Sequence, residues 1–239
     1  MKQKQLLTLT CPLRTFFLGD LHGEIHQLQR ALARHRFDPD QGDRLISVGD
    51  LIDRGADSPA CLALLEKPWF VAVQGNHEKM MLDALTGPPE TMSLWQNAGG
   101  DWYQRLPGPQ QDAIASLALR LLPKMPIALE IQIPALKARI GVVHADLPGR
   151  SWGQFANACH EGLCAEEIAF CQWSRNTLNQ ARKGAHPEPI SGIDAVVMGH
   201  TPQPNLHKLA NRIWIDTGAG YPKGSLTLLS AEQLMQCLC

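Results

Sequence analysis

One pattern occurs three times in the first third of the chain: a short apolar run, a glycine, and then polar residues of types that bind metals. The three runs end at Leu18, Val48 and Val73, and each is continuous enough for a strand buried in a parallel sheet. The polar residues that follow are Asp20 and His22, Asp50, and Asn76 and His77. Ligands bind beyond the carboxyl ends of such strands, so these side chains are expected to converge. The pattern therefore predicts a site for two metal ions at one edge of a sheet.

The composition argues against several kinds of partner. Lysine and arginine number 22 against 23 acidic residues, a net charge of −1, so no basic field favours nucleic acid or an anionic membrane. No run of 18 apolar residues predicts a membrane span. The segment from Met1 to Leu7 weakly resembles a secretion signal, but Pro12 and other residues interrupt it and no cleavage site follows.

The seven cysteines are odd in number and lack the spacing of a metal-binding finger. Free thiols of this kind are typical of a reducing compartment. We therefore expect a cytoplasmic protein. We also expect it to act as a monomer.

The spacing of apolar residues predicts an α/β fold. Helices expected at 25–36, at 58–66 and from Glu78 onward alternate with the three strands, which implies a parallel sheet with right-handed crossovers. Between Gly87 and Pro126 the sequence becomes helical in character, and its aromatic residues Trp95, Trp102 and Tyr103 are expected to pack rather than to contact substrate. We interpret residues 1–239 as one domain with a helical insertion at roughly 79–126.

The second half of the chain is expected to be mostly β. A hairpin is predicted from 127–133 and 138–143, followed by strands at 195–198, 213–215 and 225–229. Two further histidines follow predicted strands, His144 after the hairpin and His200 after the strand at 195–198. The sequence therefore places two more candidate ligands at strand ends.

Five motifs, GDLHG, GDLIDRG, GNHE, HAD and GHT, occur in that order. Together they resemble the motifs of the phosphoprotein phosphatases, a family of binuclear metallophosphoesterases. The HAD motif and the triplet Trp173–Arg175 make the chain most similar to the bacterial serine/threonine protein phosphatases and the lambda phage phosphatase. The resemblance spans Asp20 to Gly218. It implies a four-layer α/β/β/α fold, with two mixed sheets flanked by helices.

The resemblance also implies two divalent metal ions and assigns their ligands. Asp20 and His22 would hold the first ion and Asp50 would bridge both, while the second ion would be held by Asn76, His144 and His200. Oxygen and nitrogen donors without thiolate suit Mn²⁺, Fe and Zn and discriminate poorly among them. The resemblance favours Mn²⁺, with Fe, Zn, Co or Ni as alternatives. A hydroxide held between the two ions would then attack phosphorus in line.

Two catalytic tasks remain, and the resemblance implies residues for both. Arg54, Arg175 and Asn76 would bind the phosphoryl oxygens, since a guanidinium matches two such oxygens. His77 would give a proton to the leaving oxygen. Asp53 would hold the His77 ring in the required orientation.

Other polar residues near the motifs are not assigned to the metal ions or to the phosphate. Glu78 is interpreted as a carboxylate that favours the first turn of a helix. Asp146 and Asp216 are left open as outer partners of metal-bound histidines. The remaining histidines match no motif and are expected at the surface: His26, His35, His160, His186 and His207.

The function expected from these features is that of a metal-dependent phosphatase of phosphorylated proteins or peptides, acting on phosphoserine and phosphothreonine, with phosphotyrosine left open. A symmetrical diadenosine tetraphosphate hydrolase shares the five motifs but carries asparagine in place of Asp53 and aspartate in place of Glu78. A scaffold that only binds phosphopeptides is expected to have lost metal ligands, and this chain retains all of them. Hydrolysis of cyclic nucleotides stays open as a side activity.

Overall fold

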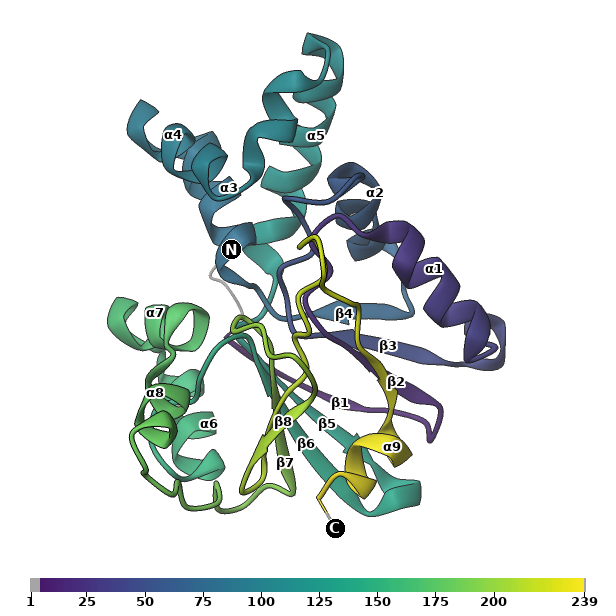
Figure 1. The fold of residues 1–239 in the computed structure, drawn as a ribbon, viewed down its shortest axis with the longest axis vertical. Helices are drawn as coiled ribbons and strands as arrows, with labels where there is room; N and C mark the ends of the chain where they lie inside the picture. The colour runs from purple at the N-terminus through teal and green to yellow at the C-terminus, as the bar shows by residue number, and fades with distance from the viewer. Residues whose placement is uncertain (1–4, 239) are drawn as a thin grey trace.

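The computed structural model describes residues 5–238, so Met1–Lys4 and Cys239 lie outside the described residues, and with them most of the segment considered above as a secretion signal. Two β-sheets stack against each other and carry helices on their outer faces (Figure 1). This is the four-layer α/β/β/α arrangement expected from the sequence. Among residues 5–238, no helix combines the length and the apolar character that crossing a membrane requires.

The four-stranded sheet contains the three strands predicted from the apolar runs. They are β2 (Thr15–Leu18), β3 (Arg44–Ser47) and β4 (Phe70–Ala72), and they run parallel in that order. The short strand β10 (Leu228–Ser230) pairs antiparallel with β2. This strand starts three residues later than predicted. It completes the sheet that the N-terminal half of the chain forms.

The six-stranded sheet is built mainly by the second half of the chain. The predicted hairpin is β5 (Ala128–Ile133) and β6 (Ala138–Val143), which pair antiparallel. Strand β7 (Ala195–Met198) runs parallel to β6, and β9 (Arg212–Trp214) runs parallel to β7. Two strands were not predicted: β1 (Leu6–Thr10) at one edge, beside β5, and β8 (His207–Leu209) at the other.

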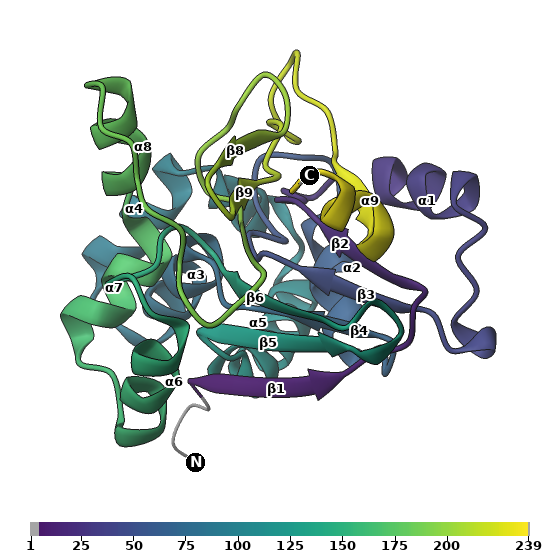
Figure 2. The same ribbon diagram turned by 90° about the horizontal axis from the view of Figure 1, so that it is seen from below.

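Side chains alternate between the two faces of each strand, and this alternation separates the layers. In β2, Phe17 points into the core between the sheets, where it joins Ile46, Leu129 and Val197. Its neighbour Phe16 points into the core beneath the outer helices. Figure 2 shows the strands of the two sheets lying over one another. The strand ends of both sheets can therefore meet at one edge.

Helices cover the outer face of each sheet. On the four-stranded sheet they are α1 (Ile25–Arg34) and α2 (Ser58–Leu62), which continues as a 3-10 helix, Ala63–Glu66. On the six-stranded sheet they are α6 (Trp152–Glu161), α7 (Ala165–Trp173) and α8 (Asn176–Arg182). Helix α9 (Ala231–Gln236) closes the core between the sheets. The expectation of a mostly β second half was wrong for residues 152–182, because these helices are short and broken by turns.

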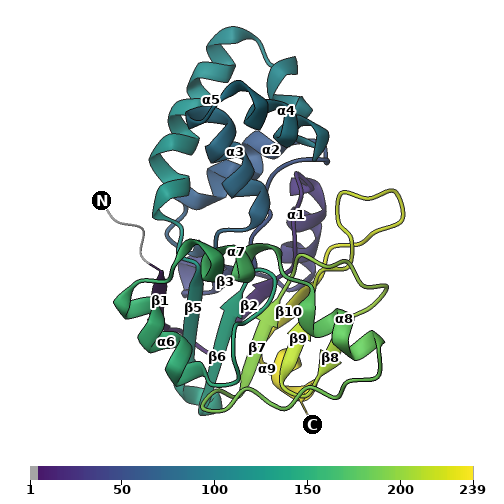
Figure 3. The same ribbon diagram turned by 90° about the vertical axis from the view of Figure 1, so that its left-hand side faces the viewer.

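The segment after β4 is helical, as expected. It comprises α3 (Asn76–Thr86), α4 (Pro89–Asn97), a 3-10 helix (Gly100–Arg105), α5 (Gly108–Leu121) and a final 3-10 turn (Leu122–Lys124). Figure 3 shows these helices standing together beyond the strand ends. Helix α3 begins at Asn76, two residues before the predicted start.

Candidate metal centre

The structure brings the six predicted metal ligands together at the strand ends where the two sheets meet. Each ligand follows a strand or begins the helix after it, because the chain must turn there to leave the sheet. All six are nearly inaccessible to solvent: Asp20, His22, Asp50, Asn76, His144 and His200. Ligand types that are usually exposed are therefore gathered in the interior, where unpaired polar groups are costly.

Close packing of backbone segments makes this convergence possible. Gly49 has a φ of 100°, a region that residues with a Cβ avoid. A Cβ at Gly49 would lie 2.8 Å from the nitrogen of Gly75 and 3.0 Å from Nδ1 of His144. The loops that follow β3, β4 and β6 can thus touch only because this residue has no side chain.

Several residues of the site have left-handed backbones, which is unfavourable for residues other than glycine. Within residues 5–238, eight non-glycine residues have positive φ. Five of the eight belong to the site: His22 at 42°, Asp50 at 49°, Asp53 at 78°, Arg54 at 69° and His200 at 66°. Local strain is therefore concentrated at this edge of the molecule.

Two groups of potential ligand atoms share Asp50. One group contains His22, Asp50 and His77, and the other contains Asp50, His144 and His200. Within each group the ligand atoms lie within 4.8 Å of one another. The structure thus places His77, predicted as a proton donor, in the first group, where Asp20 was expected.

In their neutral form, the histidines present unprotonated nitrogens to the site. Nδ1 of His144 donates to the carbonyl of Val48 at 2.7 Å, which leaves Nε2 with its lone pair. That Nε2 lies 2.8 Å from Oδ1 of Asn76 and 3.4 Å from Oδ2 of Asp50. Three electron-rich atoms then face one another, and a cation between them stabilises that arrangement. This arrangement fits a divalent metal ion.

In the first group of ligand atoms, a histidine nitrogen likewise faces carboxylate oxygens. Nδ1 of His22 donates to the carbonyl of Ile52 at 3.0 Å, so Nε2 again carries the lone pair. It lies 3.7 Å from Oδ2 of Asp50 and 4.0 Å from Oδ2 of Asp20, and it accepts a hydrogen bond from Arg54. Asp20 therefore faces the same space as the first group, although it lies slightly farther out.

Burial favours the metal-binding form of two of the three histidines, whereas for His144 the carboxylate of Asp50 outweighs burial and raises the pKa. Burial lowers the pKa of His22 and of His200 to about 3, so both rings are neutral, the form that coordinates metals. Burial, together with the negative charges of Asp216 and Asp50, raises the pKa of Asp20 well above its usual value. Such crowding of carboxylates is relieved by bound cations.

Asp146 and Asp216 do not support the histidines. Backbone carbonyls take that role for His22 and His144, as described above. The carboxylate of Asp146 instead accepts from the backbone and hydroxyl of Thr177, both at 2.9 Å. Oδ1 of Asp216 accepts from the nitrogen of Gly218 at 2.8 Å. Both carboxylates therefore order loops beside the site.

Glu78 has a larger role than a residue that only favours a helix start. Its carboxylate accepts from the nitrogens of Asp50 at 2.9 Å, Leu51 at 2.7 Å and Gly75 at 2.9 Å. It therefore fixes the backbone of the shared aspartate. Burial and the nearby charge of Asp50 raise the pKa of Glu78 to about 7.

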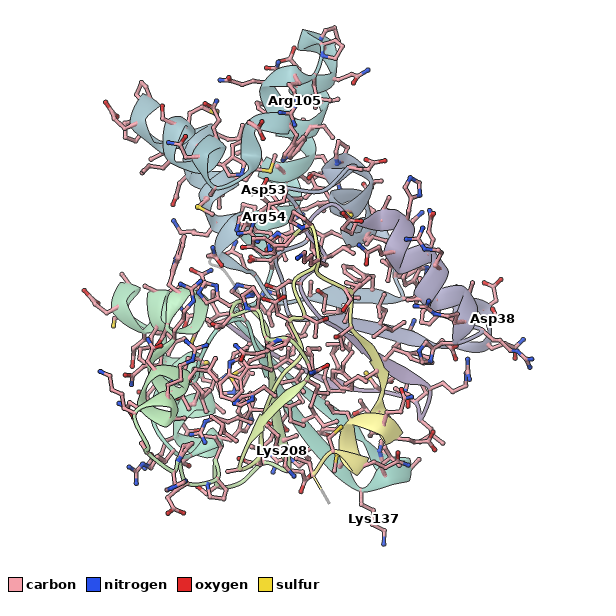
Figure 4. The ribbon with its side chains drawn as sticks, in the orientation of Figure 1. Asp38, Asp53, Arg54, Arg105, Lys137 and Lys208 are labelled. Carbon is pink, nitrogen blue, oxygen red and sulfur yellow. The ribbon has the colours of Figure 1, made fainter. Side chains whose placement is uncertain are left out.

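The residues predicted for proton transfer and phosphate binding lie beside the ligands. Nδ1 of His77 donates to Oδ2 of Asp53 at 2.6 Å. Arg54 donates to Nε2 of His77 at 2.9 Å, and its guanidinium lies 4.7 Å from the ring centre of Tyr221. Figure 4 shows Asp53 and Arg54 together at the foot of the helical segment.

A small cavity of about 170 Å³ collects these groups. It is lined by Asp50, Arg54, Asn76, His77, Met80, Ala98, Trp173, Arg175, His200 and Tyr221. Arg175, which is far from the other motifs in sequence, thus faces the same space as Arg54. A second cavity of about 790 Å³ also includes Arg54 in its lining, so the two cavities adjoin.

A sequence model of the family described as calcineurin-like phosphoesterase matches residues 13–204, most of the chain. The chain belongs to the calcineurin-like phosphoesterase family. It is 41% identical over 212 residues to serine/threonine-protein phosphatase 1 of Salmonella typhimurium, and the match covers 88% of each chain. A symmetrical bis(5'-nucleosyl)-tetraphosphatase of Actinobacillus succinogenes is 44% identical, but over 75 residues, 30% of this chain and 27% of that protein.

The fold of this calcineurin-like phosphoesterase is also found in solved structures. A Saccharomyces cerevisiae protein serine/threonine phosphatase superposes with a TM-score of 0.59 at 14% identity, covering 96% of this chain and 78% of that one. Identity this low indicates a shared fold alone.

Two aromatic residues that line the small cavity of this calcineurin-like phosphoesterase were not predicted to do so. Trp173 and Tyr221 are 45% and 46% exposed at its mouth, large values for aromatic side chains. The carbonyl of Trp173 also contacts Nε2 of His200, at 3.1 Å. The Trp-Ser-Arg triplet marked Trp173, whereas no motif in the sequence marked Tyr221.

Proposed function

We propose that the chain is a serine/threonine protein phosphatase that uses two divalent metal ions. The observation that carries the proposal is the shared carboxylate Asp50, which joins two groups of ligand atoms beneath a cavity lined by Arg54 and Arg175. Phosphate monoesters need cationic groups on several oxygens at once, and this arrangement provides them. Similarity to a serine/threonine-protein phosphatase along most of the chain supports the same activity.

The residues that would hold the two ions follow from the donor atoms. Asp20 and His22 would bind one ion. The other ion would be bound by Asn76, His144 and His200, and Asp50 would bind both. When bound, the two cations supply positive charge that activates water as a nucleophile and neutralises the phosphoryl oxygens. Mn²⁺ is the proposed ion, because carboxylate, amide and imidazole donors without thiolate suit it.

Arg54 and Arg175 would bind the phosphoryl group. Both are exposed residues that line the small cavity, so each guanidinium can reach a ligand there. Arg54 at present contacts the nitrogens of His22 and His77. A phosphoryl group would replace those contacts with stronger, charge-assisted hydrogen bonds. The amide of Asn76 would provide a further hydrogen bond to the same group.

His77 would protonate the leaving oxygen. Its Nδ1 is held by Asp53, so only Nε2 can give a proton to a group in the cavity. The carboxylate of Asp53 stabilises the ring when it is positively charged. This help matters most for a serine or threonine alkoxide, which is a poor leaving group.

The surroundings of the site support three further proposals. We propose that the protein acts as a monomer. The catalytic loops come from both sheets, so we propose that residues 1–239 act as one domain. The cysteines among residues 5–238 are free thiols, which supports a cytoplasmic location.

The substrate can be tested directly with three compounds and defined metals. We expect Mn²⁺-dependent hydrolysis of a phosphoserine peptide and of p-nitrophenyl phosphate, and loss of both activities after chelation. Diadenosine tetraphosphate, the substrate of the alternative function, is expected to react at least about 10-fold more slowly, as kcat/KM. The alternative is supported only by the short match to a tetraphosphatase. Preference for the dinucleotide, or full activity without metal, would contradict the proposal.

The larger cavity offers room for residues that flank the phosphorylated one. Ala56 is exposed and lines this cavity, and it does not line the smaller one. Ala56→Trp is therefore expected to raise KM for a phosphoserine peptide about 5- to 10-fold and to leave KM for p-nitrophenyl phosphate unchanged. Ala33→Trp, on the exposed face of α1, is the matched control. Equal effects on both substrates would show that the peptide does not enter this cavity.

A further inference from the structure

The carboxylate of Asp53 is fully buried, and both of its oxygens accept hydrogen bonds from indole rings. Nε1 of Trp95 donates to Oδ2 at 2.9 Å, and Nε1 of Trp102 donates to Oδ1 at 2.7 Å. Oδ2 also accepts from Nδ1 of His77 at 2.6 Å. The residue that orients His77 is thus itself held by two tryptophans from the helical segment.

The same segment also holds the neighbouring arginine. The carbonyl of Gly99 accepts from the nitrogen of Arg54 at 3.1 Å. Gly99 has a φ of 116°, and a Cβ there would lie 2.8 Å from Cγ of Arg54. The chain from Trp95 to Trp102 is therefore pressed against the turn that carries Asp53 and Arg54. Figure 4 shows that turn directly beneath the helical segment.

We propose that Trp95 and Trp102 are positioning residues for proton transfer. Their N–H groups hold the Asp53 carboxylate in the orientation in which it holds His77. The inference rests on the proposed phosphatase function and assigns part of it to the helical segment. A buried carboxylate is costly unless donors satisfy it, and an indole N–H can only donate. The two rings therefore order the carboxylate without competing for the proton.

Packing alone does not explain the direction of these N–H groups. Tyr103 belongs to the same aromatic cluster, with ring centres 5.5 Å from Trp95 and 6.0 Å from Trp102. Its hydroxyl, however, donates to the carbonyl of Gln111 at 3.1 Å, away from Asp53. Both indoles of the cluster point at one carboxylate, whereas the phenol does not. Tyr103 therefore provides a matched control.

The kinetic test compares leaving groups. Trp95→Phe and Trp102→Phe each remove one donor and keep an aromatic ring. Each is expected to lower kcat for a phosphoserine peptide about 10-fold, to change kcat for p-nitrophenyl phosphate less than about 2-fold, and to leave KM unchanged. Nitrophenolate leaves without a proton, so misplacement of His77 does not slow it. Tyr103→Phe is expected to change neither rate.

A spectroscopic test examines the contacts without relying on activity. In the Zn²⁺-loaded protein, Asp53→Asn is expected to shift the indole N–H NMR resonances of Trp95 and Trp102, assigned from the two Phe variants. Trp152 is the internal reference, because its Nε1 donates to Oε2 of Glu130 at 2.7 Å, an indole–carboxylate contact in which Asp53 takes no part. Its resonance is expected to stay in place.

The outcomes separate this inference from the proposed function. Equal loss on both substrates in the Phe variants would overturn the positioning role and leave the phosphatase function standing. If the indole resonances of Trp95 and Trp102 do not shift in Asp53→Asn, the positioning role is also overturned, whichever activity that variant has. A wild-type protein that fails to hydrolyse the phosphopeptide would refute the proposed function, and the positioning role in that reaction with it. Shifted resonances, together with a loss of kcat confined to the phosphoserine peptide, would support both the positioning role and the phosphatase function.

Discussion

Asp50→Asn is expected to remove phosphatase activity, lowering kcat for a phosphoserine peptide at least about 10³-fold. Asp50 is the residue common to both groups of ligand atoms, so its charge is the one that allows two cations to lie close together. An amide keeps the shape of the side chain but removes that charge. The metal content, measured by mass spectrometry, is expected to fall from two ions per chain to one or none.

Asp40→Asn is the matched control for this variant. Asp40 is exposed on the turn before β3, outside both groups of ligand atoms. We expect it to retain both ions and full activity. Two bound ions and near-normal activity in Asp50→Asn would show that Asp50 is not the bridging ligand. Circular dichroism must show that both variants are folded, because Asp50 also accepts at Oδ1 from the nitrogen of His77.

His77→Asn has the second largest expected effect. If His77 protonates the leaving oxygen, kcat for a phosphoserine peptide should fall about 10²- to 10³-fold. The loss on p-nitrophenyl phosphate should be at least about 10-fold smaller, since nitrophenolate needs no proton. The measurement is a comparison of kcat for the two substrates at saturating metal.

Because His77 also lies in the first group of ligand atoms, its loss could act through the metal instead. Metal content therefore has to be measured on the same preparation, and it is expected to be unchanged. His26→Asn, which alters an exposed histidine on α1, should behave as wild type on both substrates. Loss of one ion with equal effects on both substrates would instead make His77 a ligand.

Features carried by contiguous motifs could be predicted from the sequence. The three parallel strands follow from apolar runs, and each candidate ligand stands directly after such a run, so local sequence also gives its place in the sheet. The convergence of Asp20, Asp50 and Asn76 follows from that reading, whereas the four layers and the role of His144 were implied by the family resemblance. The strand β1 was missed because its apolar residues, Leu6 and Leu7, lie in a segment that resembled a weak secretion signal.

Contacts between distant segments could not be predicted. The N–H groups of Trp95 and Trp102 reach a carboxylate more than 40 positions earlier in the chain, and packing was the natural expectation for both rings. The same holds for Glu78, which bonds to the backbone of Asp50. The periodicity of apolar residues and local motifs predict local structure, but they do not predict which distant residue a side chain contacts.

The left-handed backbone conformations at the site affect which substitutions evolution favours there. Glycine would relax the chain at positions such as Asp53 and Arg54, where other residues are disfavoured by about 1–2 kcal/mol. The chain retains reactive side chains there at the expense of folding stability. Selection for stability alone would therefore favour loss of these side chains. In a related protein that no longer needs the activity, we expect glycine to replace the residues of these turns before residues of the buried strands are substituted.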